Sequence, residues 1–184
     1  LVGSEMCIRD SADTAMKGNR LPVSVTHYYN SCDSDKDEFG MGYGWRTSLH
    51  QTLHKVLYNG EVAFVYTDGD GTEHFFKKNK DDQKKYSDQS GLSLTLEVGD
   101  ENITITDKGD NVMMFPMVSD TPTEDAPETA KVLIQKIQDA VGNEVTVTAV
   151  ADAPLKIASV TDGAGRVTTL HYTDGRCDRI QTPW

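Results

Sequence analysis

Histidine side chains are the residues of this sequence that could most readily support a metal or acid–base site. The chain has five of them: His27, His50, His54, His74 and His171. On a helix, His50 and His54 would lie one turn apart, a spacing that metals use, but a zinc protease also needs Glu directly after the first His, and Gln51 stands there. On a strand, the two imidazoles would only share an exposed face. Histidines scattered in this way predict neither a metal site nor an acid–base pair.

An acidic run between residues 30 and 44 is the second place where chemistry is conceivable. Asp33, Asp35 and Asp37 follow the alternation with which a calcium loop begins. Such a loop also needs Gly at its sixth place and Glu at its twelfth, where this sequence has Glu38 and Gly44. We therefore interpret the run as a solvated acidic loop, and assign no catalytic, cofactor-binding or metal residue anywhere in the chain.

A phrase that recurs along the chain indicates how it is organised. Asp is followed three residues later by Gly or Asp, then by Thr, Asn or Arg, and at the eighth place by an apolar residue. An Asp carboxylate accepts hydrogen bonds from backbone N–H groups ahead of it, and Gly adopts the positive φ that closes such a loop. The copies begin at Asp68, Asp107, Asp139 and Asp162. The turn residues assigned on this basis are Asp68, Gly71, Asp107, Asp139, Gly142, Asp162, Gly165 and Arg166.

The last of these turns opens a meander over residues 159–180. A second turn, assigned to Tyr172, Asp174, Gly175 and Arg176, follows a short run with high β propensity. Side chains alternate along a strand, so Val167, Thr169 and His171 should face one way, and Thr168, Leu170 and Tyr172 the other. The stretch predicts strand, turn, strand, turn, strand.

Alternating apolar residues predict further strands and an all-β fold. The expected strands are 21–29, 91–98, 102–106, 131–138 and 144–150, with a short helix as the alternative at 131–138, and a hairpin over 60–77. Residues 45–58 fit either a helix or a long strand. Lysine-rich residues 77–85 should form a solubilising surface loop, and residues 151–154 a break between strands. The acidic, Pro- and Thr-containing segment 119–130 should be a mobile loop.

Composition excludes some classes of partner. The chain of 184 residues has the length of one domain and a formal net charge of −11, which argues against binding to nucleic acid. No apolar run reaches the length of a membrane span. Cys32 and Cys177 could pair in an oxidising compartment, but two cysteines so far apart are more often unpaired.

The two ends of the sequence suggest an internal fragment. Residues 1–11, LVGSEMCIRDS, begin without Met and resemble a peptide produced when sequencing-adapter DNA is translated. We therefore expect them to be a non-native artefact that lies outside the fold. At the other end, residues 182–184 follow directly after an expected strand, which suggests a chain cut within an array of hairpins.

Two blocks of the sequence resemble the RHS/YD-repeat proteins, a family that includes bacterial polymorphic-toxin carriers, wall-associated proteins and, more distantly, teneurins. The first block is GNRLPV at 18–23, YNS at 29–31 and GYGWR at 42–46, similar to the segment that leads into the repeats. The second is DGAGR at 162–166 with YTDGR at 172–176. Leu170 replaces a customary Tyr, Thr173 separates Tyr172 from Asp174, and Gly175 follows without the usual gap, so this repeat is degenerate.

The resemblance implies a fold and a role. Repeats of this family form β-hairpins that spiral into a shell, which can enclose a toxic C-terminal domain. The resemblance therefore implies three regions. Residues 12–118 are a hairpin region before the repeats, residues 119–130 are the acidic mobile segment, and residues 131–184 are degenerate repeats. It implies a structural, non-enzymatic segment of a large secreted or cell-surface protein, with no cofactor, whose partners are the rest of its own chain and a C-terminal toxin.

One other function remains open from the residues themselves. A free-standing β-sandwich-like module could bind carbohydrate or adhere to a cell surface through exposed aromatic rings. The rings that would form such a platform are Tyr28, Tyr43, Trp45 and Tyr58. Burial of these rings in a core would argue against this alternative.

Overall fold

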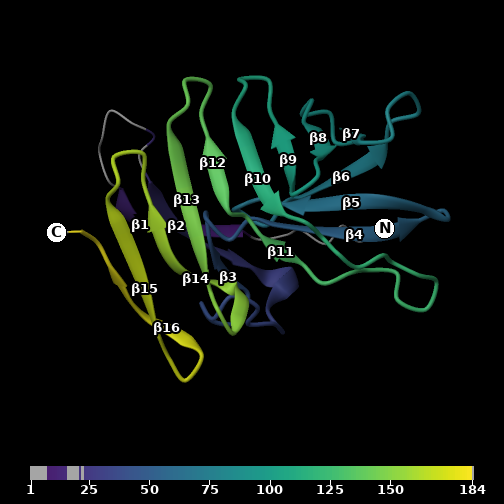
Figure 1. Cartoon of the computed structure of the whole chain (residues 1–184). Coiled ribbons are helices and arrows are strands. Elements are labelled where there is room, and N and C mark those ends of the chain that lie inside the picture. The colour runs from purple at the N-terminus through teal and green to yellow at the C-terminus, as the bar shows by residue number, and fades with distance from the viewer. Residues whose placement is uncertain (1–7, 16–20, 22, 184) are drawn as a thin grey trace.

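The structure is a computed structural model that describes residues 8–15, 21 and 23–183 (Figure 1). Its strands form two antiparallel sheets, which confirms the all-β prediction. The N-terminal sheet contains β1 (Ile8–Ala15), β2 (Ser24–Asn30) and β3 (Trp45–Thr47), in that order. Within the described residues the only helix is the short 3-10 helix η1 (Ser31–Asp33).

The large sheet contains thirteen strands. Its first eight in chain order are β4 (Thr52–Tyr58), β5 (Glu61–Thr67), β6 (Glu73–Lys78), β7 (Lys85–Asp88), β8 (Thr95–Val98), β9 (Asn102–Thr106), β10 (Val112–Pro116) and β11 (Val132–Leu133). The others are β12 (Lys136–Gln138), β13 (Glu144–Val150), β14 (Ala153–Thr161), β15 (Val167–Thr173) and β16 (Arg176–Gln181). From β4 to β10 and again from β12 to β16, each strand pairs with the next one in the chain, so the predicted succession of hairpins is confirmed.

The segment 132–138 changes partners midway and so joins two parts of the large sheet. β11 pairs with β4, whereas β12 pairs with β10 and β13. Successive N–H groups of an extended chain point to opposite sides. The Ile134 amide accordingly donates to the Gln51 carbonyl (2.9 Å), and the next amide, of Gln135, donates to the Met114 carbonyl (2.9 Å). The expected single strand is therefore two short strands, and the helical alternative is wrong.

One face of the large sheet carries the core. Its largest fully buried side chains include Phe64, Phe76, Ile105, Phe115 and Val160, which come from strands along most of the sheet. The apolar residues at the eighth place of the four Asp phrases, Phe76, Phe115, Val147 and Leu170, are all buried. The predicted alternation in β15 holds as well, since Thr168 and Leu170 are buried and Val167 is exposed.

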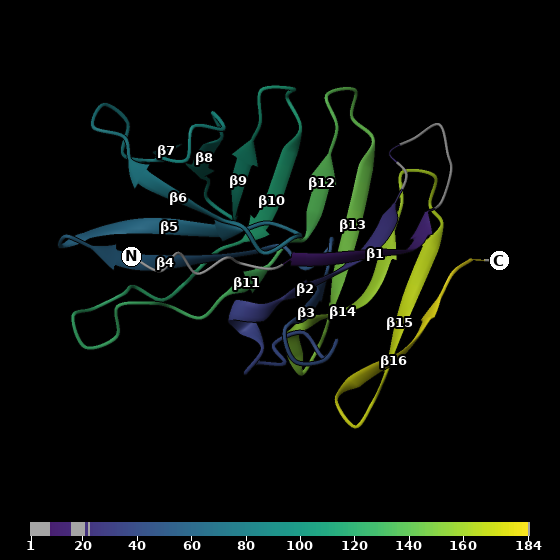
Figure 2. The same cartoon turned by 180° about the vertical axis from the view of Figure 1, so that it is seen from behind.

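The N-terminal sheet packs on this core and crosses β13 and β14 of the large sheet (Figure 2). Val23 and Val25 belong to the same cluster of buried side chains as Val145 and Ile157. Residues 8–11, which we expected to lie outside the fold, form the first half of β1 and pair with β2. Their proposed origin in adapter DNA stays a prediction, and residues 1–7 lie outside the described part of the chain.

Several expected boundaries differ from the structure. Residues 45–58 form neither a helix nor one strand, because a tight turn with a hydrogen bond from the His50 amide to the Thr47 carbonyl (2.9 Å) separates β3 from β4. Asn59 and Gly60, with φ of 51° and 79°, make a two-residue turn between β4 and β5 that our reading of the sequence missed. The expected surface loop shortens to residues 79–84, and β14 begins inside the expected break.

The acidic segment 119–130 lies against β4 at its C-terminal half. The Leu57 amide donates to the Pro127 carbonyl (2.8 Å), and the Thr129 amide donates to the Lys55 carbonyl (3.0 Å). Lys55 Nζ reaches back to the carbonyls of Val118 (2.6 Å) and Asp120 (3.0 Å). The segment is thus attached to the sheet at both ends, and the mobility that we expected stays a prediction.

Candidate functional site

The four Asp phrases form turns with one shared hydrogen-bond pattern. In each, one carboxylate oxygen of Asp accepts from the amides two and four residues ahead. These pairs of donors are Asp70 and Thr72 for Asp68 (3.2 and 3.0 Å), Gly109 and Asn111 for Asp107 (2.7 and 2.9 Å), Val141 and Asn143 for Asp139 (3.1 and 2.8 Å), and Ala164 and Arg166 for Asp162 (2.9 and 2.8 Å). The carboxylate therefore supplies the acceptor that backbone amides in a tight turn lack.

The backbone closes each turn at the fourth position. The residue there has a positive φ: 98° at Gly71, 58° at Asp110, 87° at Gly142 and 78° at Gly165. A residue with a Cβ is strained in this region, whereas Gly is not. Asp110 is thus the one of these four closing residues that stores backbone strain. In Figure 1, the turns between β9 and β10, β12 and β13, and β14 and β15 lie along the same rim of the large sheet.

The second carboxylate oxygen of each turn has a partner that differs between copies. In three copies it accepts a hydrogen bond, from Asn111 Nδ2 (2.9 Å), Asn143 Nδ2 (2.7 Å) or Arg166 Nε (2.6 Å). In the first copy it lies 3.0 Å from His74 Nε2. The hydrogen bonds from the side chains of Asn111 and Asn143 hold the pKa of Asp107 and of Asp139 below the ordinary value. At Asp162 burial opposes ionisation, but the bonds from Arg166 outweigh it and lower the pKa.

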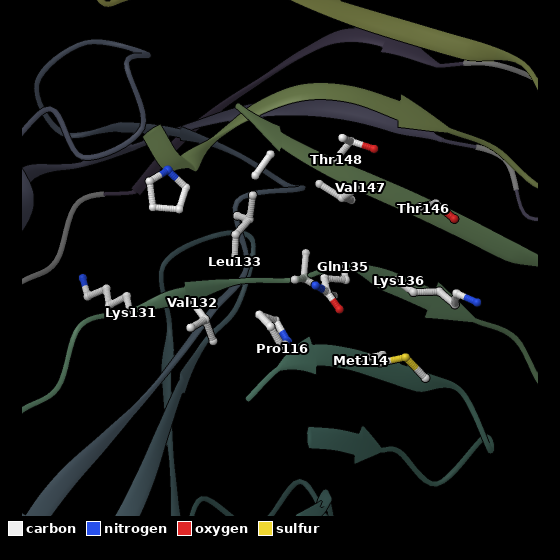
Figure 3. A pocket seen from close by; sticks show the side chains of 13 residues that line it. Met114, Pro116, Lys131, Val132, Leu133, Gln135, Lys136, Thr146, Val147 and Thr148 are labelled. Carbon is white, nitrogen blue, oxygen red and sulfur yellow. The ribbon is translucent and has the colours of Figure 1, made fainter. Parts of the chain in front are cut away.

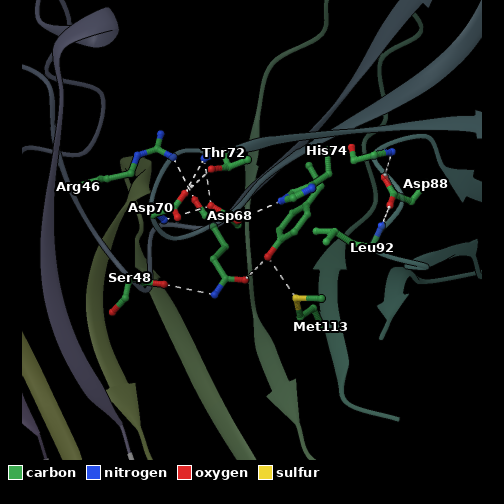
Figure 4. A network of polar contacts seen from close by, with 12 residues as sticks. Arg46, Ser48, Asp68, Asp70, Thr72, His74, Asp88, Leu92 and Met113 are labelled. Carbon is green, nitrogen blue, oxygen red and sulfur yellow. Dashed lines mark hydrogen bonds and ion pairs between the residues drawn. The ribbon is translucent and has the colours of Figure 1, made fainter. Parts of the chain in front are cut away.

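Asp68 differs from the other three because its turn is part of a larger polar network that includes Arg46 (Figure 4). Burial, followed by its neighbour Asp70, raises the pKa of Asp68 above the ordinary value. Its carbonyl accepts a hydrogen bond from Arg46 Nη1 (3.2 Å), which links the N-terminal sheet to the large sheet. Nearby, the Tyr66 hydroxyl donates to Gln51 Oε1 (2.8 Å).

The second predicted turn joins β15 to β16. Asp174 and Gly175, with φ of 50° and 80°, form its two central residues. The Tyr172 hydroxyl donates to the Ile157 carbonyl (2.9 Å), and Arg176 Nε lies 3.5 Å from Asp37. The adjoining Cys177 amide donates to the Gly40 carbonyl (2.7 Å), so the loop of residues 31–44 contacts the end of the large sheet.

The histidines do not form a metal site in the part of the chain that the structure describes. His50 and His54 are buried, not exposed as a shared strand face would require. Thr47 Oγ1 lies 2.8 Å from His50 Nδ1, and burial lowers the pKa of His50 to about 3. An imidazole with this pKa is neutral at physiological pH and serves the packing beneath Phe39, whose ring centroid lies 4.6 Å away.

The acidic loop holds its own carboxylates. Asp33 accepts from Asn30 Nδ2 (3.0 Å), and Asp37 accepts from the Gly42 amide (3.0 Å). Among the described residues, Cys32 and Cys177 are free thiols, with Cys32 exposed and Cys177 half-buried. Of the four candidate platform rings, Tyr43 and Tyr58 are exposed, whereas Tyr28 and Trp45 are half-buried.

An apolar groove of about 630 Å³ lies between the segment 131–136 and strands β10 and β13 (Figure 3). Leu133, Ile134 and Val147 are its buried lining residues, and Met114 and Pro116 line it from β10. The groove is a product of the change of strand partners. The sequence marked Val147 only as the apolar residue at the eighth place of an Asp phrase, and it predicted no groove here.

Two further features escaped our reading of the sequence although a signal was present. Asp88 begins another Asp-x-x-Gly sequence, and its carboxylate accepts from the amides of Ser90 (2.8 Å) and Leu92 (2.8 Å). The Asn59-Gly60 dipeptide is a strong hairpin signal.

The burial of Arg46, by contrast, has no local signal. Arg46 belongs to the block GYGWR, but nothing nearby in the sequence indicates that its side chain is buried.

Comparisons with known proteins bear on the N-terminal part of the chain. Residues 6–76, from the start of the N-terminal sheet into β6, match a family described as a domain of unknown function (DUF6531). No curated protein matches the chain. Within the described residues no helix has the length and apolar character to span a membrane. Similarity to that family thus covers the N-terminal sheet, the acidic loop and the Asp68 turn.

Proposed function

We propose that this chain is a structural, non-enzymatic segment of a large secreted or cell-surface RHS-repeat protein. In this proposal its strands build part of a β-shell, of the kind with which bacterial polymorphic-toxin carriers enclose or present a C-terminal toxin domain. The sequence resemblance described above supplies the family. The geometry of the large sheet supplies the physical support.

The observation that carries the proposal is the construction of the large sheet from chain-neighbouring hairpins that end in an open edge. On one side β16 pairs with β15, and within the described residues no strand pairs with its other side. An unpaired edge presents N–H and C=O groups that a further strand can satisfy. A sheet of this kind grows by adding hairpins without changing those already present.

The Asp turns support a scaffold role for a second reason. Each carboxylate is occupied by amides of its own turn, so these acids are engaged in holding the chain and not in facing a substrate. Local hydrogen bonds of this kind make each hairpin specify its own reversal of direction. Repetition of one turn along one rim suits a wall built from repeats.

Long-read sequencing of the source DNA across both ends of this sequence is the first test. The proposal expects the reading frame to continue past Trp184 into further hairpins with Tyr-Asp and Gly-Arg signatures. In the longer product, the amides of β16 should exchange with deuterium more slowly than in the 184-residue chain, because a next strand would cover them. A stop codon directly after Trp184 would refute the proposal.

A carbohydrate-binding or adhesive module is the second candidate, favoured by two exposed tyrosines. Tyr43 is 55 % exposed beside Arg176, and Tyr58 is 45 % exposed beside Lys77. Glycan-array binding that is lost in Tyr43→Ala or Tyr58→Ala, but kept in a Tyr28→Ala control, would favour this candidate. An array with no bound glycan would exclude it for the glycans tested.

A further inference from the structure

Arg46 is a buried cation with few partners. Its side chain comes from β3, and only 4 % of the residue is exposed. Among the described residues, its guanidinium makes one hydrogen bond, to the Asp68 carbonyl, and one ring contact, with Phe39 at 4.8 Å from the centroid. A guanidinium has five N–H donors, so most of those of Arg46 make no hydrogen bond to the described residues.

The carboxylates around Arg46 are engaged with other donors. Glu38 accepts two bonds from Lys131 Nζ (2.7 and 3.0 Å), and Asp33 accepts from Asn30. Asp70 accepts from the amide and the hydroxyl of Thr72 (2.9 and 2.6 Å). The positive charge of Arg46 is thus surrounded by acids at longer range but lacks a close anion.

A polar cavity of about 300 Å³ opens beside this guanidinium. Asn30, Arg46 and Thr67 line it and are each 4 % exposed, and the cavity is bordered by Asp33, Glu73 and Lys131. The Thr67 hydroxyl is buried and has no hydrogen-bond partner. Buried hydroxyl groups normally have a partner, so this one points to a missing acceptor or donor.

We propose that this cavity binds a small organic carboxylate, with Arg46 as its principal partner and the Thr67 hydroxyl as a second donor. The planar guanidinium matches the two oxygens of a carboxylate, which it binds through two parallel N–H bonds. The volume lies at the small end of ligand cavities, which suits a molecule of few heavy atoms.

The charges at the cavity select a monoanion. Along the lining, the two positive charges of Arg46 and Lys131 equal in number the two negative charges of Asp33 and Glu73. Lys131 is already ion-paired with Glu38, which leaves Arg46 as the cation of the lining without a close anion. A single added negative charge therefore pairs with the one cation that lacks a close anion. A phosphate dianion would bring a second charge toward Asp33 and Glu73, where like charges repel.

Titration of the 184-residue chain with sodium acetate, followed by NMR of the backbone amides and the Arg46 side chain, tests the proposal. Sodium chloride at equal ionic strength is the control for screening, and inorganic phosphate is the control for a dianion. We expect saturable shifts at Arg46, Asn30 and Thr67 with acetate and none with chloride. Shifts that are equal in acetate and chloride would overturn the proposal, as would tighter binding of phosphate than of acetate.

A matched pair of substitutions separates binding from folding. Thr52 and Thr67 face each other across β4 and β5, and both hydroxyls are buried without a partner, but only Thr67 lines the cavity. We expect Thr67→Val to keep the fold and to weaken acetate binding by about three- to tenfold, the value of one hydrogen bond. Thr52→Val should leave acetate binding unchanged.

Arg46→Met provides the larger change and has its own safeguard. Loss of the guanidinium should abolish saturable acetate binding, with the fold checked by the amide spectrum. Should this variant fail to fold, the comparison of Thr67→Val with Thr52→Val still decides. Acetate affinities that are equal in those two variants would overturn the assignment of the cavity.

Discussion

The turn at Asp107 and the turn at Asp68 have the same backbone geometry but differ in their surroundings. Both Asp side chains accept from the amides two and four residues ahead. Asp107 lies on the rim of the large sheet, where its bond from Asn111 lowers its pKa. Asp68 is partly buried beside Asp70 and beneath Arg46, and burial raises its pKa. Local sequence thus determines the shape of the turn, while tertiary position determines its electrostatics.

Among the four Asp turns, the largest loss of stability should come from Asp162, whose side chain is buried. Asp162→Ala removes an acceptor of three hydrogen bonds and one ion-pair contact, and leaves Arg166 without its carboxylate. Breaking a buried ion pair from one side costs several kcal/mol, so we expect a loss of about 3 kcal/mol in the free energy of unfolding. Urea denaturation followed by circular dichroism measures it.

The control for this prediction is the same substitution on the rim. Asp107→Ala removes the turn bonds without leaving a half-buried cation that has lost its carboxylate, and should cost about 1 kcal/mol. Equal losses in the two variants would show that burial of the Asp side chain does not determine how much its turn contributes to stability.

The pH dependence of stability should have opposite signs at Asp107 and Asp68. A lowered pKa means that Asp107 stabilises the fold above its unfolded value near 3.8 and loses this contribution as the pH falls further. A raised pKa means that the folded protein protonates Asp68 above 3.8, before the unfolded chain does, so this group favours folding as the pH falls.

Removing each carboxylate in turn should therefore change the acid limb of the stability curve in opposite directions. Compared with the wild type, Asp107→Asn should lose stability less steeply on acidification, and Asp68→Asn more steeply. Thermal melts between about pH 5 and pH 3 at constant ionic strength measure the slopes. Slopes that change in the same direction would contradict the assigned environments.

Strain at the closing position should be relieved by glycine. Asp110→Gly replaces a residue at a φ of 58° and should raise stability by about 0.5–1 kcal/mol. The reciprocal change, Gly142→Ala, meets no atom within 4 Å, so its expected loss of about 1 kcal/mol reports backbone strain alone. A stabilising Gly142→Ala would refute the argument from φ.

The smallest effect should come from Asn111, the residue that follows Asp110. Asn111→Ala removes one partly exposed side-chain bond to Asp107 and keeps both amide bonds, so we expect a loss of about 0.5 kcal/mol. Urea denaturation measures it. A loss as large as that of Asp107→Ala would mean that the side chain, and not the amides, holds the turn.

Much of the fold could be predicted because its strands carry a short-range signal. Residues 102–106 and 144–150 alternate cleanly and are strands with these bounds. Residues 131–138 show the limit of this reasoning. The pattern indicates an extended chain, but it contains nothing to say that Ile134 and Gln135 bond to strands on opposite sides, because partner choice depends on how the whole sheet is arranged.

The sequence by itself determined the strands and the Asp turns of this protein, since alternation, carboxylate acceptors and glycine φ all act within a few residues. Only the tertiary structure decided which of these groups are buried. His50, Thr67 and Arg46 are polar residues that become buried where the N-terminal sheet and the loop of residues 31–44 meet β4 and β5. Burial sums contacts from distant segments, which no local pattern encodes.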